Sequence, residues 1–136
     1  MTIMKGGCQC GAVRYEASGE PAFAAHCQCL DCKKSSGAGH VTAAGFPEGS
    51  VKFTGATKTY ASTADSGGNV RREFCPECGG RIAFRGENFA GMVLLMAGSL
   101  DDPSPLKPGA ALYDKHHVEW DHFDPALPRP PGMPPQ

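Results

Sequence analysis

Hydrophobic and polar residues alternate along several short stretches of the chain, with the period of two that is typical of strands. Residues 12–17 show the pattern clearly, because Val13 and Tyr15 fall on one face and charged residues on the other. Residues 92–97 are apolar throughout and indicate a buried strand that ends at Gly98. Further strands are predicted at residues 51–54 and 57–60, as two arms around Gly55, and at 70–74 and 81–84.

Helix signals are scarce. One short turn of helix is expected from Asp31 through Lys34, where Ser-Ser-Gly ends it, and a weaker indication covers residues 64–66. Beyond Phe123 the sequence DPALPRPPGMPPQ predicts an extended or disordered tail rather than core. We therefore expect one mostly β domain of short antiparallel sheets with little helix over residues 1–123, followed by a Pro-rich C-terminal tail over residues 124–136.

Length and charge narrow the function classes. A chain of 136 residues suits one domain, and a net charge of −1 gives no attraction toward nucleic acid or an anionic membrane. The N-terminal MTIMKGGCQCG lacks the apolar core of a signal peptide, and the longest apolar run is far shorter than the ~18 residues of a membrane helix. We expect a soluble, cytoplasmic protein, in which seven cysteines point to metal ligation or thiol chemistry rather than disulfides.

The cysteines fall into local pairs and one triplet. The string Cys75-Pro-Glu-Cys78-Gly-Gly is typical of a zinc knuckle, because its glycines allow the chain to reverse after the second ligand. A C-x-C pair on a strand aims both sulfurs at one ion, and such pairs occur at Cys8/Cys10 and Cys27/Cys29. If Cys27 and Cys29 joined the knuckle, Cys32 would be left without a partner.

The grouping that leaves no cysteine without partners divides the seven cysteines between two zinc ions per chain. The predicted structural site, which would staple the fold, has four ligands: Cys8, Cys10, Cys75 and Cys78. The predicted catalytic site has three ligands and an open fourth position: Cys27, Cys29 and Cys32. Two alternatives stay open: His26, Asp31 or His40 supplies a fourth ligand and closes the second site, or Cys32 is a free thiol.

Three thiolates limit what a zinc ion can do. They leave the complex with a formal charge of −1, which suits the ion poorly to activating water and better to accepting another thiolate from a substrate. The bound thiol would lose its proton and act as nucleophile or leaving group. Lys33, Lys34 or Arg81 are candidates to face the carboxylates of such a thiol.

Four strings in the sequence carry a family resemblance: GGCQCGAVRYE, HCQCLDCKKSSGA, FCPECGGRIAF and GSLDDP. In this order, over residues 6–120, the chain resembles the glutathione-dependent formaldehyde-activating enzyme family, which includes the centromere protein V type of domain. The resemblance implies a tent of small β-sheets, also shared with a Rab-binding chaperone and methionine sulfoxide reductase B. It implies structural zinc at the four-cysteine set and catalytic zinc at the three-cysteine set. The implied reaction joins glutathione to formaldehyde, giving S-hydroxymethylglutathione, and reverses it.

The chain departs from the usual family pattern without touching a ligand. Gln28 and Lys33 stand where histidine and arginine are common, and Glu119 replaces the proline before Trp120. The leading hypothesis is a zinc-dependent carbon–sulfur lyase or synthase that acts on the adduct of a thiol, such as glutathione, with a small carbonyl such as formaldehyde. The alternative is a non-catalytic zinc-stapled β module that binds a protein or carries metal. Hydrolysis by zinc-bound water is disfavoured by the anionic ligands.

Overall fold

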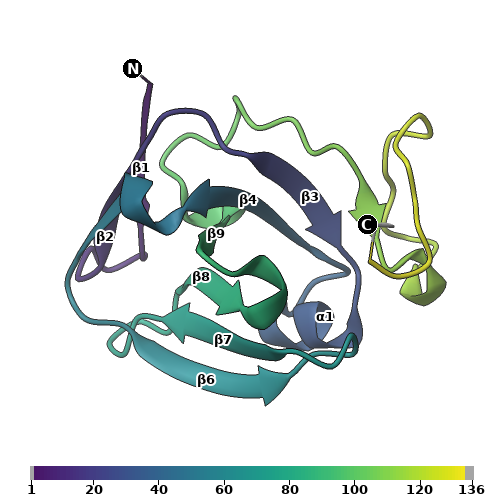
Figure 1. Ribbon diagram of the computed structural model, residues 1–136, viewed down its shortest axis with the longest axis horizontal. Coiled ribbons are helices and arrows are strands. Elements are labelled where there is room, and N and C mark those ends of the chain that lie inside the picture. Colours follow the sequence, from purple (N-terminus) through teal and green to yellow (C-terminus); the bar gives the residue numbers. More distant parts are fainter. Residues whose placement is uncertain (1, 134–136) are drawn as a thin grey trace.

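The computed structural model describes residues 2–133, which form a mostly β structure around one short helix (Figure 1). The strands are β1 (Ile3–Gly7), β2 (Arg14–Ser18), β3 (Phe23–Cys27), β4 (Val41–Pro47), β5 (Val51–Thr54), β6 (Lys58–Thr63), β7 (Asn69–Phe74), β8 (Arg81–Gly86), β9 (Met92–Met96) and β10 (Ala111–Leu112). The helix is α1 (Leu30–Ser36). Single 3-10 turns follow β4, β8, β9 and β10, at Glu48–Ser50, Glu87–Phe89, Ala97–Ser99 and Asp114–His116.

The strands divide between two sheets. β1, β2 and β5 form a three-stranded antiparallel sheet, and the others form a seven-stranded sheet in the order β10-β3-β4-β9-β8-β7-β6. Neighbours in the larger sheet are antiparallel except for β10 beside β3. Figure 1 shows this sheet curving from β3 on one side to β6 and β7 on the other, with α1 close to the end of β3. The prediction of a mostly β fold is confirmed.

One apolar core lies between the two sheets. Val13, Tyr15 and Ala17 are fully buried, as the alternation predicts, and pack with Ile82 and Leu95 of the larger sheet. The Tyr15 hydroxyl reaches the Ser99 hydroxyl at 2.6 Å, so the buried phenol keeps a hydrogen-bond partner. Strand β9 runs through the centre of the large sheet, and the apolar run in the sequence reflects its burial.

Several sequence predictions need correction. Residues 51–54 and 58–63 are both strands, but β5 pairs with β2 and β6 pairs with β7, so they are not arms of one hairpin. Residues 64–66 belong to the turn between β6 and β7, where the Ala64 N–H donates to the Gly68 carbonyl at 2.7 Å, and not to a helix. The predicted helix after Asp31 is confirmed and extends to Ser36, with Gly37 as a left-handed cap. No helix among residues 2–133 is long and apolar enough to cross a membrane.

The Pro-rich tail begins with a turn, in which the Leu127 N–H donates to the Asp124 carbonyl at 3.0 Å, and then hydrogen-bonds to residues 111–115. The N–H groups of Ala111 and Tyr113 donate to the carbonyls of Pro128 and Gly132 at 2.9 and 3.1 Å. Arg129 also pairs with Asp114 at 2.7 Å. Residues 128–132 therefore lie along residues 111–115, while residues 134–136 of the predicted tail lie outside the described residues, and the division of the chain at residue 123 stays a prediction.

Candidate metal centres

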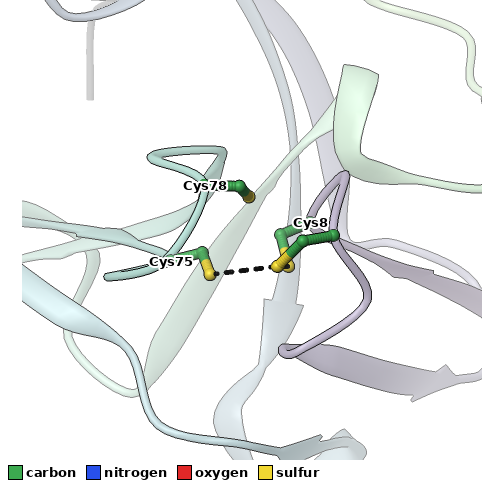
Figure 2. A group of neighbouring side chains, drawn as sticks. Cys8, Cys75 and Cys78 are labelled. Atoms are coloured by element: carbon green, nitrogen blue, oxygen red, sulfur yellow. Dashed lines mark hydrogen bonds between the residues drawn. The ribbon is translucent and has the colours of Figure 1, made fainter.

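The first cysteine cluster gathers four sulfurs from two distant turns. Cys8 and Cys10 lie in the turn after β1, and Cys75 and Cys78 lie in the turn between β7 and β8. All four Sγ atoms lie within 4.8 Å of one another. Figure 2 shows the sulfurs of Cys8, Cys75 and Cys78 directed toward a common centre.

The geometry of this four-cysteine cluster fits zinc. Cys10 Sγ lies 3.6 Å from Cys8 Sγ and 3.7 Å from Cys75 Sγ. Four sulfurs held at ~2.3 Å around a tetrahedral ion would lie about 3.8 Å apart. The Val13 N–H donates to Cys8 Sγ at 3.3 Å and lowers the pKa of that thiol to about 6, which favours the thiolate that a metal requires. In the knuckle, Gly79 adopts φ +74°, the left-handed conformation that the sequence predicts for this reversal.

The four-cysteine cluster links the two sheets. Cys8 and Cys10 belong to the connection within the three-stranded sheet, whereas Cys75 and Cys78 join two strands of the seven-stranded sheet. A bidentate Arg14–Asp101 pair, with an Nη1–Oδ1 distance of 2.9 Å, and a bridge between Gly6 and Leu100 support the same junction. Because surface ion pairs contribute little, a metal here would dominate the stability of this junction.

The second cluster consists of Cys27, Cys29 and Cys32, whose sulfurs also lie within 4.8 Å of one another. Cys27 ends β3, Cys29 caps the N-terminus of α1, and Cys32 lies in its first turn. The Cys32 N–H donates to Cys29 Sγ at 3.3 Å, so the start of the helix holds the cluster together. The three-cysteine cluster is the set that the sequence spacing predicts, and its sulfur donors suit zinc.

The structure gives this cluster no fourth protein ligand. Within residues 2–133, no histidine or carboxylate donor groups with the three sulfurs. His26 Nδ1 lies 2.7 Å from the Thr42 hydroxyl, and His40 Nδ1 lies 2.6 Å from Asp121 Oδ2. Asp31 lines the cavity beside the cluster without joining it. Among the described residues, the alternative of a site closed by one of these three side chains is therefore not supported.

Two arginines place positive charge beside the three-cysteine cluster. Arg72 is only 8% exposed, donates to the Ser62 hydroxyl at 2.7 Å, and helps to lower the pKa of Cys29. Arg81 donates from Nη1 to the Ser35 carbonyl at 3.3 Å, and its buried Nε lacks a partner in the described structure. Burial lowers the pKa of Arg81, while Cys32 opposes this shift. Three thiolates on a divalent ion carry a net negative charge, which these guanidinium groups offset.

Arg72 is a site residue that the sequence analysis missed. It occupies the buried face of β7 together with Val70, while Arg71 and Asn69 point outward. A charged residue in phase with apolar neighbours along a strand is the signal that identifies it. By contrast, Lys33 donates to the His116 carbonyl and Lys34 is exposed. Lys33, Lys34 and Arg81 do not line the cavity described below.

Gln28, where the chain departs from the family pattern, is a structural residue. Its side chain is fully buried, and the residue stands between Cys27 and Cys29 in the sequence. Gln28 Oε1 lies 2.6 Å from His117 Nδ1, and its amide approaches the Leu112 carbonyl at 3.4 Å. Gln28 thereby fastens the segment after β10 to the loop that carries Cys27 and Cys29.

A cavity of about 380 Å³ opens onto the three-cysteine cluster. All three of its cysteines line this cavity, together with Arg72 and Tyr113. Tyr113 is 6% exposed and adopts φ +58°, a strained conformation for a residue with a side chain. Burial raises the pKa of its phenol, so the group keeps its proton at neutral pH. The cluster therefore faces a small cavity whose wall includes a hydrogen-bond donor.

Comparison with known proteins agrees with the two cysteine clusters. The family model described as glutathione-dependent formaldehyde-activating enzyme matches residues 3–116. The chain belongs to this family. Among solved structures, a Rhodobacter sphaeroides protein determined by structural genomics has a similar fold, with a TM-score of 0.60 and 23% identity over 75% of this chain and 94% of that chain. No curated protein matches the chain. Membership supports a zinc-containing protein, since the family resemblance assigns zinc to the same cysteines.

Loss of the four-cysteine cluster should unfold the protein. We expect Cys75→Ser to be insoluble or unfolded, because structural zinc contributes ~10 kcal/mol or more to folding. The matched variant Cys32→Ser makes the same chemical change in the other cluster and should remain folded with one zinc ion. Soluble yield, circular dichroism and zinc content check both variants. A soluble, folded Cys75→Ser protein would contradict the structural role.

Zinc affinity of the three-cysteine cluster should rise steeply with pH. In the metal-free cluster, hydrogen bonds from Cys27 and Cys32 hold the pKa of Cys29 far below its usual range. The same interaction with Cys29 raises the pKa of Cys27 to about 12, and hydrogen bonds with Cys27 and Cys29 raise that of Cys32 as well. Zinc must therefore displace two protons, and we expect its affinity to increase about 100-fold per pH unit near neutrality.

Competition with a chelator at several pH values measures this slope, provided that the four-cysteine cluster stays loaded. A slope of about tenfold per unit would mean that only one of the two thiols carries a proton, and would contradict the assignment.

Proposed function

We propose that the protein is a zinc-dependent carbon–sulfur lyase or synthase that acts on the adduct of a thiol with a small carbonyl compound. The observation that carries the proposal is the position of three cysteine sulfurs at the wall of an apolar cavity, without a fourth protein donor among the described residues. Three protein ligands with an exchangeable fourth are the arrangement of catalytic zinc. The family name makes glutathione and formaldehyde the first pair to test.

The charge of the ligands favours a thiol over water as the fourth partner. Zinc bound by three thiolates would lower the pKa of a substrate thiol and keep it as a thiolate. In the synthetic direction the thiolate sulfur forms a bond to the carbonyl carbon, the carbonyl π electrons move to oxygen, and the oxygen takes up a proton. The thiol gives up one proton and the oxygen gains one, so the reaction needs no oxidant or reductant. Cleavage is the reverse.

Three side chains provide the positive charge and the hydrogen-bond donor that this reaction needs. Arg72, at the cavity wall, and Arg81, close to Cys32, offset the added negative charge when a fourth thiolate binds. Tyr113 lines the same cavity and keeps its proton, so its hydroxyl can donate a hydrogen bond to the carbonyl oxygen as that oxygen becomes charged. The apolar surroundings of the site strengthen both effects.

The cellular setting follows from the thiols. All seven cysteines are free, and a three-thiolate site that loses its metal is prone to oxidation. We expect the protein to work in a reducing compartment such as the cytoplasm, with two zinc ions and a small-molecule thiol as partners, and without nucleic acid.

The zinc content and the response to a thiol test the proposal together. We expect about two zinc ions per chain and faster adduct formation from glutathione and 13C-labelled formaldehyde, measured by NMR exchange above the spontaneous rate. Cys32→Ser should keep one zinc and lose the acceleration. One tightly held zinc with no response to any thiol would instead favour the non-catalytic zinc-stapled module.

Removing the phenol hydroxyl tests the role of Tyr113. Tyr113→Phe should lower kcat about 100-fold and leave KM nearly unchanged, because the hydrogen bond forms as charge develops on oxygen. Tyr60→Phe makes the same change on an exposed side chain outside the cavity and should retain full activity. Equal kcat for the two variants would remove Tyr113 from the mechanism.

A further inference from the structure

We infer that the thiol taken by this site carries an apolar, uncharged substituent rather than the charged groups of glutathione. The inference rests on the proposed function, because it concerns the part of the substrate that occupies the cavity while its sulfur lies at the three-cysteine cluster. It is carried by the composition of the cavity wall and by the charges found there.

Apolar side chains make up most of the wall. Phe23 and Phe89 stack with ring centroids 6.0 Å apart and planes at 29°, and both line the cavity. Further apolar wall residues come from strands β7, β8, β9 and β10 and from the tail: Val70, Phe84, Leu94, Leu112 and Met133. A volume of about 380 Å³ lies at the small end of ligand pockets, which favours a compact apolar group.

The charged groups of the wall do not match glutathione. Near neutral pH glutathione carries two carboxylates and one ammonium group, whereas the wall offers one guanidinium, Arg72, and two carboxylates, Asp31 and Asp65. Arg72 already donates to Ser62, and Asp65 pairs with Lys115 at 3.2 Å. At least one glutathione carboxylate would therefore leave water without a cationic partner, at a cost of several kcal/mol.

The three cationic side chains that the sequence predicts to face the carboxylates of a thiol lie elsewhere. Lys33 is tied to the His116 carbonyl, Lys34 is exposed on the helix, and Arg81 contacts the Ser35 carbonyl. None of the three lines the cavity. A thiol with a hydrocarbon chain or ring avoids this cost and gains from burial against the aromatic pair.

A series of thiols tests the inference by binding rather than by turnover. The zinc-loaded protein is titrated by calorimetry with glutathione, glutathione diethyl ester and phenylmethanethiol. The same thiols are added to protein with cobalt in the three-cysteine cluster, where a change in the sulfur–cobalt charge-transfer bands of the protein thiolates reports binding at the metal. We expect phenylmethanethiol to bind at least about tenfold more tightly than glutathione, with the diethyl ester between them.

The outcomes separate this inference from the proposed function. Glutathione binding as tightly as phenylmethanethiol, or more tightly, overturns the inference and leaves the proposed function in place. Failure of every thiol to bind overturns the proposed function as well.

A change of charge in the wall provides a second test. Phe89→Lys places a cation in the cavity and should reduce the preference for phenylmethanethiol over glutathione by about tenfold. Tyr60→Lys adds the same charge to a side chain that is 65% exposed and does not line the cavity, and should leave the preference unchanged. An unchanged preference in Phe89→Lys would show that the substituent does not occupy this cavity and would overturn the inference.

Discussion

The convergence of four thiols from two sheets is the constraint on which the rest of the structure depends. The three-stranded sheet and the turn between β7 and β8 meet at Cys8, Cys10, Cys75 and Cys78, with sulfur separations that suit one tetrahedral ion. Strands β7 and β8 also supply cavity wall on the other side of the fold, so the junction helps to fix the shape of the proposed substrate site. A zinc ion bound there would couple metal binding to the folding of both sheets.

The second cluster has the same sulfur donors as the first but lies in a different environment. Its three sulfurs come from one short segment, the end of β3 and the first turn of α1, so it adds little to the long-range order of the chain. It differs from the first cluster in its surroundings, which are an apolar cavity, two arginines and a buried phenol. In such a setting electrostatic interactions are stronger than in water, which suits chemistry in which a thiolate and a developing oxyanion need fixed partners.

The sequence alone predicted the two cysteine clusters because each is built from short motifs whose cysteines are close together in the chain. The knuckle around Gly79 and the triplet ending in Cys32 are short motifs whose spacing reflects ligand geometry. Strands β3 and β4 were missed because they are rich in alanine and β4 is buried on both faces, which removes the alternation that marks a strand. Arg72 could have been found from its phase on β7.

The cavity could not be predicted, because its wall is assembled from residues far apart in the chain, from Phe23 to Met133. The family resemblance assigns the zinc ligands, whereas the proposed substrate selectivity rests on the apolar wall of this chain. The central claim is that one zinc has four protein sulfurs and the other has three. Zinc X-ray absorption of the holoprotein should give an average of about 3.5 sulfurs per zinc, rising to about 4 when phenylmethanethiol is added. An average of four without added thiol, or no change on its addition, would contradict the account.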